Sequence, residues 1–162
     1  MWHSLEHCPD PREVCLLANK VLKKKGHLVI VVPNFESLQS AIGKNHWTYL
    51  DVPHHLFHFT HKGLDLLLSK AGYRLEKSYR FSLEYDLFGW QQTIVNLFTK
   101  SHNYFYNKAK KNRVNQTLTY PRWTKLISVF QILFLPATIL LSLISSIINR
   151  PSCLVCTYQK IR

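Results

Sequence analysis

Residues 27–34 read His-Leu-Val-Ile-Val-Val-Pro-Asn, and this stretch decides the fold class. A continuous apolar run rich in β-branched residues is typical of a strand buried on both faces of a sheet. A helix is predicted directly before it, because Asp10 can cap a helix that begins at Pro11 and Glu13 completes a capping box. Lys23 to Lys25 and then Gly26 favour the end of that helix. The order helix, glycine, buried strand indicates an α/β layered fold.

The rest of the chain extends this pattern, and the chain as a whole divides into four parts. A loop with one short helix is expected over 34–58, and Thr60 and Gly72 bound a further helix. Apolar and polar residues alternate over Tyr73–Leu83, which predicts a strand, and Cys153–Tyr158 is rich in β-formers and predicts a short closing strand. We expect a folded part over 1–86, an amphipathic helix and basic linker over 87–125, an apolar helical segment over 126–148 and the closing strand over 149–162.

Charge is distributed unevenly along the 162 residues. Residues 1–86 contain 11 basic and all 9 acidic residues, whereas residues 87–162 contain 10 basic and no acidic residue. This asymmetry excludes a uniformly basic nucleic-acid module and indicates that the second half meets an anionic surface. The basic and aromatic stretch 100–123 could contact RNA, but the adjoining apolar segment favours lipid headgroups, so no nucleic-acid partner is expected.

The apolar segment Leu126–Ile148 has 23 residues without a charge and is long enough to span a bilayer. A full crossing would separate Cys153–Lys160 from the strand at 27–32. Pro136 can divide the segment into two short halves, so we favour a helical hairpin that dips into one leaflet. The expected location is cytoplasmic, at the inner face of the membrane, with a single-pass protein as the alternative.

Five stretches in order carry a resemblance to a known family: Met1-Trp-His-Ser-Leu-Glu-His-Cys-Pro-Asp-Pro11, Val32-Pro-Asn34, Trp47, Leu50-Asp-Val-Pro-His-His-Leu-Phe-His-Phe-Thr60 and Ala71-Gly-Tyr73. Together they resemble the C-terminal half of class I S-adenosylmethionine-dependent methyltransferases, in the branch near the ubiquinone-biosynthesis O-methyltransferases. The resemblance implies the C-terminal portion of a Rossmann-like sheet, with an apolar helical insertion before the last strand. It places Met1–Leu5 at the end of the fourth strand, 27–32 in the fifth, 73–83 in the sixth and 153–158 in the antiparallel seventh.

The resemblance implies methyl transfer from S-adenosylmethionine to an oxygen or nitrogen acceptor. A membrane-side acceptor, such as a quinone precursor or a lipid-linked sugar, would suit the apolar segment. The family's glycine-rich turn for the cofactor is absent, because the five glycines lie far apart in the chain. We therefore interpret the chain as truncated or as one piece of a split enzyme, inactive without a separate chain that supplies the N-terminal half. The alternative is a non-enzymatic, membrane-anchored module that has lost cofactor binding.

The resemblance also selects candidate site residues on the acceptor side of the crevice. Glu6, His7, His54 and His55 are the candidate catalytic residues, because a histidine there could take a proton from an acceptor hydroxyl. Trp47 and His58 are candidates for the substrate pocket. The competing interpretation is a packed loop in which Phe57 and Phe59 fill core positions.

A metal site is a weaker alternative at the same place. In related small-RNA and quinone-ring methyltransferases, Glu-x-x-Glu-His in this loop contributes to a divalent-metal site. Here His3 replaces the first glutamate, so His3, Glu6 and His7 would suit Zn²⁺ better than Mg²⁺, and we expect no metal. A metal-dependent hydrolase that uses the histidine cluster stays open. Cys153 and Cys156 would point to opposite faces of a strand and so are not expected to chelate.

Overall fold

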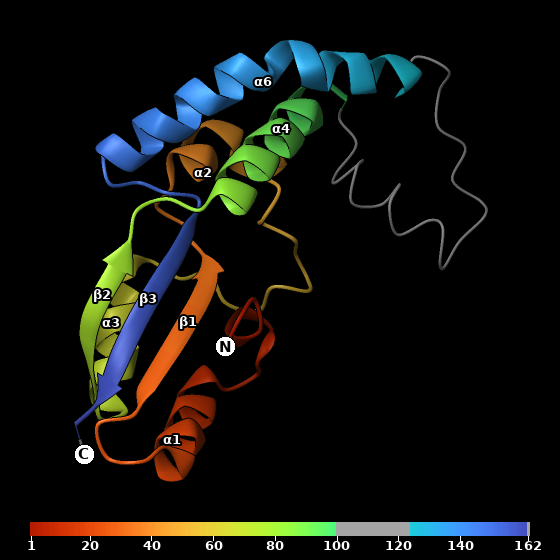
Figure 1. The fold of residues 1–162 in the computed structure, drawn as a ribbon. Coiled ribbons are helices and arrows are strands. Elements are labelled where there is room, and N and C mark those ends of the chain that lie inside the picture. The colour runs from red at the N-terminus through yellow and green to blue at the C-terminus, as the bar shows by residue number, and fades with distance from the viewer. Residues whose placement is uncertain (100–123, 162) are drawn as a thin grey trace.

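The computed structural model describes residues 1–99 and 124–161 and shows a mixed α/β fold (Figure 1). The strands β1 (His27–Pro33), β2 (Tyr73–Tyr79) and β3 (Cys153–Lys160) form one sheet in the order β1-β3-β2. The helices are α1 (Pro11–Val21), α2 (Leu38–Gly43), α3 (His61–Lys70), α4 (Leu83–Thr99) and α6 (Thr124–Ile147), with 3-10 helices η1 (Leu5–His7) and η2 (Lys44–His46).

The last strand in sequence is the middle strand of this sheet. β3 pairs antiparallel with β1, from His27 opposite Gln159 to Pro33 opposite Cys153, and antiparallel with β2 on its other side. The predicted antiparallel closing strand is therefore confirmed. The predicted strand over 73–83 ends earlier, at Tyr79, because α4 already begins at Leu83.

The helix starts follow the predicted capping residues. Asp10 Oδ1 accepts a hydrogen bond from Glu13 N at 2.9 Å, and Thr60 Oγ1 accepts one from Gly63 N at 3.0 Å. Helix α1 stops at Val21, however, and Lys25 rather than Gly26 adopts the positive φ of 61° in the turn that follows. The expected basic helix end at residues 23–25 is thus a turn.

Strand β1 is buried only in its second half. Ile30, Val31 and Val32 are fully buried, whereas Val29 is 42% exposed, so the prediction of burial along the whole strand is wrong. The reason is the edge of β1 opposite β3, along which Met1–His3 make a short parallel bridge. Val31 N donates to Met1 O and His3 N donates to Val31 O, both at 2.9 Å.

The hydrophobic core lies between the sheet and the helices α1 and α3. Its buried members come from every layer: Leu5, Cys15, Ile30, Val32, Phe59, Leu64, Leu68, Ala71, Tyr73, Leu154, Cys156 and Tyr158. All four cysteines are free, and Cys153 and Cys156 contact different side chains, those of His3 and Ser78. This agrees with the expectation that the two do not chelate together.

Helices α4 and α6 pack on each other above the end of the sheet where β1 finishes and β3 begins (Figure 1). Asp86 ties this pair to the sheet. Its carboxylate accepts hydrogen bonds from Ser82 N at 2.8 Å, Ser152 N at 2.9 Å and Ser152 Oγ at 2.7 Å. The buried Asp86 thus joins the start of α4 to the residue that precedes β3.

The helical hairpin predicted for the apolar segment is wrong. Helix α6 continues through Pro136, whose ring removes one backbone donor without dividing the helix. Among the residues that the structure describes, no helix combines the length and hydropathy that a membrane crossing requires, so the expected membrane span gains no support. The basic and aromatic stretch 100–123, part of the linker predicted from the sequence, lies outside the described residues.

Candidate functional site

The site is built where the N-terminal residues leave the edge of β1. The bridge between Trp2 and Val31 holds this end of the chain, and η1 then turns Glu6 and His7 beneath residues 51–58, here called the histidine loop. The Glu6 carbonyl accepts hydrogen bonds from Leu56 N at 2.8 Å and Phe57 N at 3.2 Å. Two segments about fifty residues apart in sequence are thereby fixed against each other.

Three predicted catalytic residues meet at this contact. Glu6, His7 and His55 each offer a ligand atom, and these atoms all lie within 4.8 Å of one another. The imidazole rings of His7 and His55 meet edge to face, with their centroids 4.7 Å apart. We call these residues the Glu6–His7–His55 cluster.

Backbone carbonyls orient both imidazoles of the cluster. His7 Nδ1 lies 2.9 Å from His54 O, and His55 Nδ1 lies 2.8 Å from Tyr49 O. A carbonyl oxygen can only accept, so Nδ1 of each ring carries the hydrogen. The Nε2 atom of each neutral ring therefore keeps its lone pair, ready to accept a proton or bind a cation.

Glu6 is the buried member of the cluster, with 0% of its surface exposed. Its Oε1 lies 3.1 Å from His3 Nδ1, whereas its Oε2 has no hydrogen-bond partner within the described part of the chain. Buried carboxylate oxygens nearly always have a donor or a cation beside them. The orphaned Oε2 thus indicates that a ligand belongs at this position.

The His55 ring is kept neutral by its surroundings. Burial lowers its pKa below the usual 6.5, and the hydrogen bond to the Tyr49 carbonyl and the carboxylates of Glu6 and Asp51 oppose this only in part. At pH 7 the lone pair on Nε2 is therefore available.

The other predicted histidines lie outside the cluster. The His54 side chain is 73% exposed with Nδ1 3.5 Å from Asp51 Oδ1, and only its carbonyl serves the cluster. His58 Nε2 donates to Leu50 O at 2.9 Å. A catalytic role for the His54 ring and a pocket role for His58 stay predictions.

Trp47 is fully buried rather than open to a cavity. Its ring lies beside Phe35, at a centroid distance of 6.2 Å, and edge-on to Tyr49, at 5.9 Å. It therefore supports Tyr49, whose carbonyl orients His55, and its predicted place in the substrate pocket stays a prediction.

His3 does not belong to the candidate donor group, although the metal alternative considered from the sequence included it. Its Nδ1 is turned to Glu6, and its Nε2 lies 3.9 Å from Cys153 Sγ. His3 thus holds the Glu6 carboxylate, and the candidate donor group contains His55 in its place. His3 also has a positive φ of 42°, a conformation that non-glycine residues rarely adopt outside constrained sites.

Two aromatic residues that were not among the candidates from sequence, Tyr49 and Tyr85, border the cluster. The Tyr85 ring, at the start of α4, lies 4.4 Å from the His3 ring, centroid to centroid, and its hydroxyl accepts a hydrogen bond from Trp2 Nε1. Burial raises the pKa of Tyr85 and, more strongly, that of Tyr49, so both hydroxyls stay protonated at neutral pH. No sequence motif marks Tyr85, because α4 reaches the site only through the fold.

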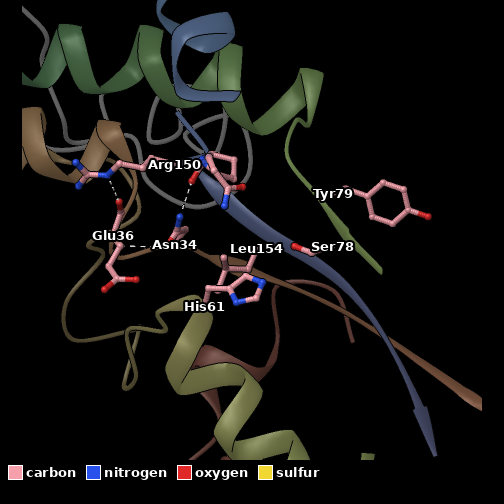
Figure 2. Close-up of a pocket in the computed structure, with 9 residues that line it drawn as sticks. Asn34, Glu36, His61, Ser78, Tyr79, Arg150 and Leu154 are labelled. Atoms are coloured by element: carbon pink, nitrogen blue, oxygen red, sulfur yellow. Dashed lines mark hydrogen bonds between the residues drawn. The ribbon is translucent and has the colours of Figure 1, made fainter. Parts of the chain in front are cut away.

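A separate polar cavity of about 330 Å³ opens where β1 and β2 end and β3 begins (Figure 2). Inside it, Arg150 Nε donates to Glu36 O at 2.7 Å and Asn34 Nδ2 donates to Pro151 O at 2.8 Å. None of the predicted site residues lines this cavity, which is formed by Asn34, Glu36, His61, Ser78, Tyr79, Asn149, Arg150, Pro151 and Leu154.

Comparison with known proteins gives one finding, which concerns the first 78 residues of the chain. No curated protein matches the chain. Residues 1–78, which contain η1, β1 and the histidine loop, match the family described as a methyltransferase domain. This part of the chain is therefore similar to methyltransferase domains, a family that implies S-adenosylmethionine as the methyl donor.

Proposed function

We propose that the chain provides the acceptor side of a methyltransferase that transfers a methyl group from S-adenosylmethionine to an oxygen or nitrogen atom. The observation that carries this proposal is the Glu6–His7–His55 cluster within the matched residues. Two of its residues, Glu6 and His7, follow Trp2, which bridges the edge of β1 in parallel, and open α/β sheets bind their ligands just past the ends of parallel strands.

The chemical step follows from the tautomer of His55. An acceptor hydroxyl or amine would donate its hydrogen to His55 Nε2, because Nδ1 already donates to the Tyr49 carbonyl. As the acceptor atom forms its bond to the methyl carbon, the carbon–sulfur bond of the sulfonium breaks and its electron pair stays on sulfur. The proton ends on His55, and S-adenosylhomocysteine leaves. Most of the rate then comes from positioning and from exclusion of water.

The cluster also fits a divalent cation. One buried carboxylate with an orphaned oxygen and two imidazoles held by carbonyl hydrogen bonds are the donor set and second shell of Zn²⁺ sites. Glu6, His7 and His55 would hold the ion, and His55 Nε2 would then be a ligand in place of the base described above. The chemistry of the ion there would be that of a Lewis acid, which lowers the pKa of an acceptor hydroxyl.

The cofactor's methionine and ribose parts need groups that residues 1–162 do not present, because no glycine-rich turn can be formed from five scattered glycines. We propose that a separate polypeptide supplies the first strands and the glycine-rich turn. The edge of β1 opposite β3 supports this, because Met1–His3 bond to it only at Val29 and Val31, and Trp2 and Val29 near this edge and Val21 on α1 are exposed apolar residues.

Titration with S-adenosylhomocysteine tests this arrangement. The full chain alone should bind it no better than millimolar. In the presence of a polypeptide that carries a glycine-rich turn and the first four strands of a class I methyltransferase, binding should become micromolar and methyl transfer should appear. Micromolar binding by the chain alone contradicts the two-part arrangement, and absence of transfer in the complemented pair contradicts the proposed function.

Variants of the cluster separate the acceptor side from cofactor binding. In the complemented pair, Glu6→Gln and His55→Ala should each lower the rate of transfer by at least about 10²-fold, the usual contribution of a general base, and leave S-adenosylhomocysteine binding unchanged. The matched control is His27→Ala, since His27 is an exposed histidine of β1 that pairs with Glu76. Full activity of His55→Ala contradicts its role as the base.

A second candidate is a non-enzymatic module, which the absence of a glycine-rich turn favours. It predicts that no complementing polypeptide restores cofactor binding. The same titration therefore decides between the two functions.

A further inference from the structure

Helix α6 exposes apolar side chains and buries polar ones, which is the reverse of a helix on the surface of a water-soluble protein. Between Ile132 and Ile148, every exposed residue is apolar, and every fully buried residue carries a hydroxyl group. A surface helix normally turns its apolar stripe to the core and its polar residues to water. This segment does the opposite.

The outer face of α6 consists of large aliphatic side chains. Ile132 is 74% exposed and Ile147 is 78% exposed, at the two ends of the described segment. Between and beside them lie further exposed apolar residues, namely Leu133, Leu135, Pro136, Ala137, Ile139, Leu140, Leu143, Ile144 and Ile148. We call this set the outer face of α6. Contiguous apolar surface of this extent marks an interaction site.

The fully buried residues of α6 are Thr138, Ser142 and Ser145, each about one helical turn from the next. Each hydroxyl donates to a carbonyl of its own helix: to Leu135 O at 2.9 Å, to Thr138 O at 2.7 Å and to Leu141 O at 2.7 Å. These small side chains need no water and let α6 approach α4 closely. Helices packed together in a lipid environment use small residues in this way.

We propose that the outer face of α6 lies on an anionic lipid surface, with the helix parallel to the membrane plane. Charge selects this occupant over a second copy of the chain. By sequence, residues 87–162 contain 10 basic residues and no acidic one, a composition that anionic headgroups complement and that a second copy of the same chain does not. Arg150, which is exposed just beyond Ile148, is one such cation.

Helix α4 connects α6 to the residues around the site. Helix α6 packs on α4, and Tyr85 in the first turn of α4 borders the cluster through His3. An acceptor dissolved in or tethered to the membrane would therefore approach from the side of α4.

Sedimentation of the full chain with vesicles tests the proposal. The chain should bind vesicles of phosphatidylcholine that contain phosphatidylglycerol and should bind pure phosphatidylcholine vesicles less. The double variant Leu133→Glu/Leu140→Glu should lower the partition coefficient at least about tenfold, which corresponds to about 1.4 kcal/mol. The control is Leu66→Glu, which changes a leucine on α3 that is also more than half exposed and should leave binding unchanged.

Circular dichroism of the variants, which change only exposed positions, checks that the fold is retained. Failure of the wild-type chain to bind the mixed vesicles overturns the proposal. Binding that the double variant does not weaken also overturns it. A concentration-dependent dimer that the double variant abolishes, without vesicle binding, overturns it in favour of a second copy as the occupant. None of these results depends on methyl transfer.

Discussion

Replacing Glu6 by Gln should stabilise the protein in the absence of metal, even though Glu6 belongs to the candidate site. The Glu6 carboxylate is fully buried, His3 is the one hydrogen-bond partner that the described residues give it, and Oε2 has none. A buried acceptor without a partner costs about 1–3 kcal/mol, and more when it is charged. A neutral amide of the same length lowers that cost and can keep one bond to His3. We therefore expect Glu6→Gln to raise the free energy of unfolding by about 1–2 kcal/mol.

Urea unfolding of the full chain measures this difference. With a slope of about 2 kcal/mol per molar, the midpoint should rise by about 0.5–1 M in buffer that contains a chelator. Zn²⁺ should make the wild type more stable than Glu6→Gln, because a ligand at about 100 times its Kd stabilises the protein that binds it by about 2.7 kcal/mol. Wild-type protein should gain this stabilisation, and Glu6→Gln should lose most of it.

The control is Glu84→Gln, which changes an exposed glutamate on α4 and should shift neither midpoint. If metal-free Glu6→Gln is less stable than wild type, the reasoning from the orphaned oxygen is refuted. Equal stabilisation of both proteins by Zn²⁺ would instead refute the assignment of Glu6 as a ligand.

Two further predictions concern packing and pH. Gly89→Ala should destabilise the protein by about 1–3 kcal/mol despite better helix propensity, because its Cβ would lie 2.6 Å from Gln39 Oε1 and 2.8 Å from Tyr49 Cε2, and both neighbours are held in place. Gly63→Ala, whose Cβ meets only Thr60 Oγ1 at 3.1 Å, should change the unfolding midpoint less, and an equal effect would contradict the packing argument. Because burial lowers the pKa of His55 below 6.5, the stability it contributes is present above pH 6.5 and is lost as the pH falls through the folded-state pKa. Unfolding midpoints between pH 5 and 8 should therefore fall less steeply with acid in His55→Gln than in wild type; parallel curves would show that His55 does not titrate in this way.

The parts of the fold that could be predicted from sequence depend on near neighbours. Asp10 and Thr60 cap helices through bonds to residues three positions later, and β1 and β3 follow from local runs of β-branched residues. Helix α6 was mispredicted at Pro136 because packing on α4, which no local pattern contains, keeps the helix continuous.

The candidate site was likewise predictable only where it depends on near neighbours in sequence. Glu6 and His7 follow from a short motif, but the choice of His55 as their neighbour depends on the path of the histidine loop. That path is fixed by the bonds of the Glu6 carbonyl to Leu56 and Phe57 and by the Tyr49 carbonyl. Likewise, the sequence could not predict that His3 contacts Glu6 and leaves the candidate donor group, because this depends on a side-chain distance within the folded loop.

The central position of the last strand has a consequence for the order in which the protein matures on the ribosome. Within the described residues, β1 and β2 pair with β3 and not with each other, so neither can join a sheet until residues 153–160 have left the exit tunnel. Helix α6 is synthesised before β3 and is therefore free to settle on a bilayer while the sheet is still open. Once β3 emerges, it would insert between two waiting strands, and Asp86 would bind Ser152 only at that moment. A stop codon that removes the last ten residues should leave the helices without the strand that joins the two edges.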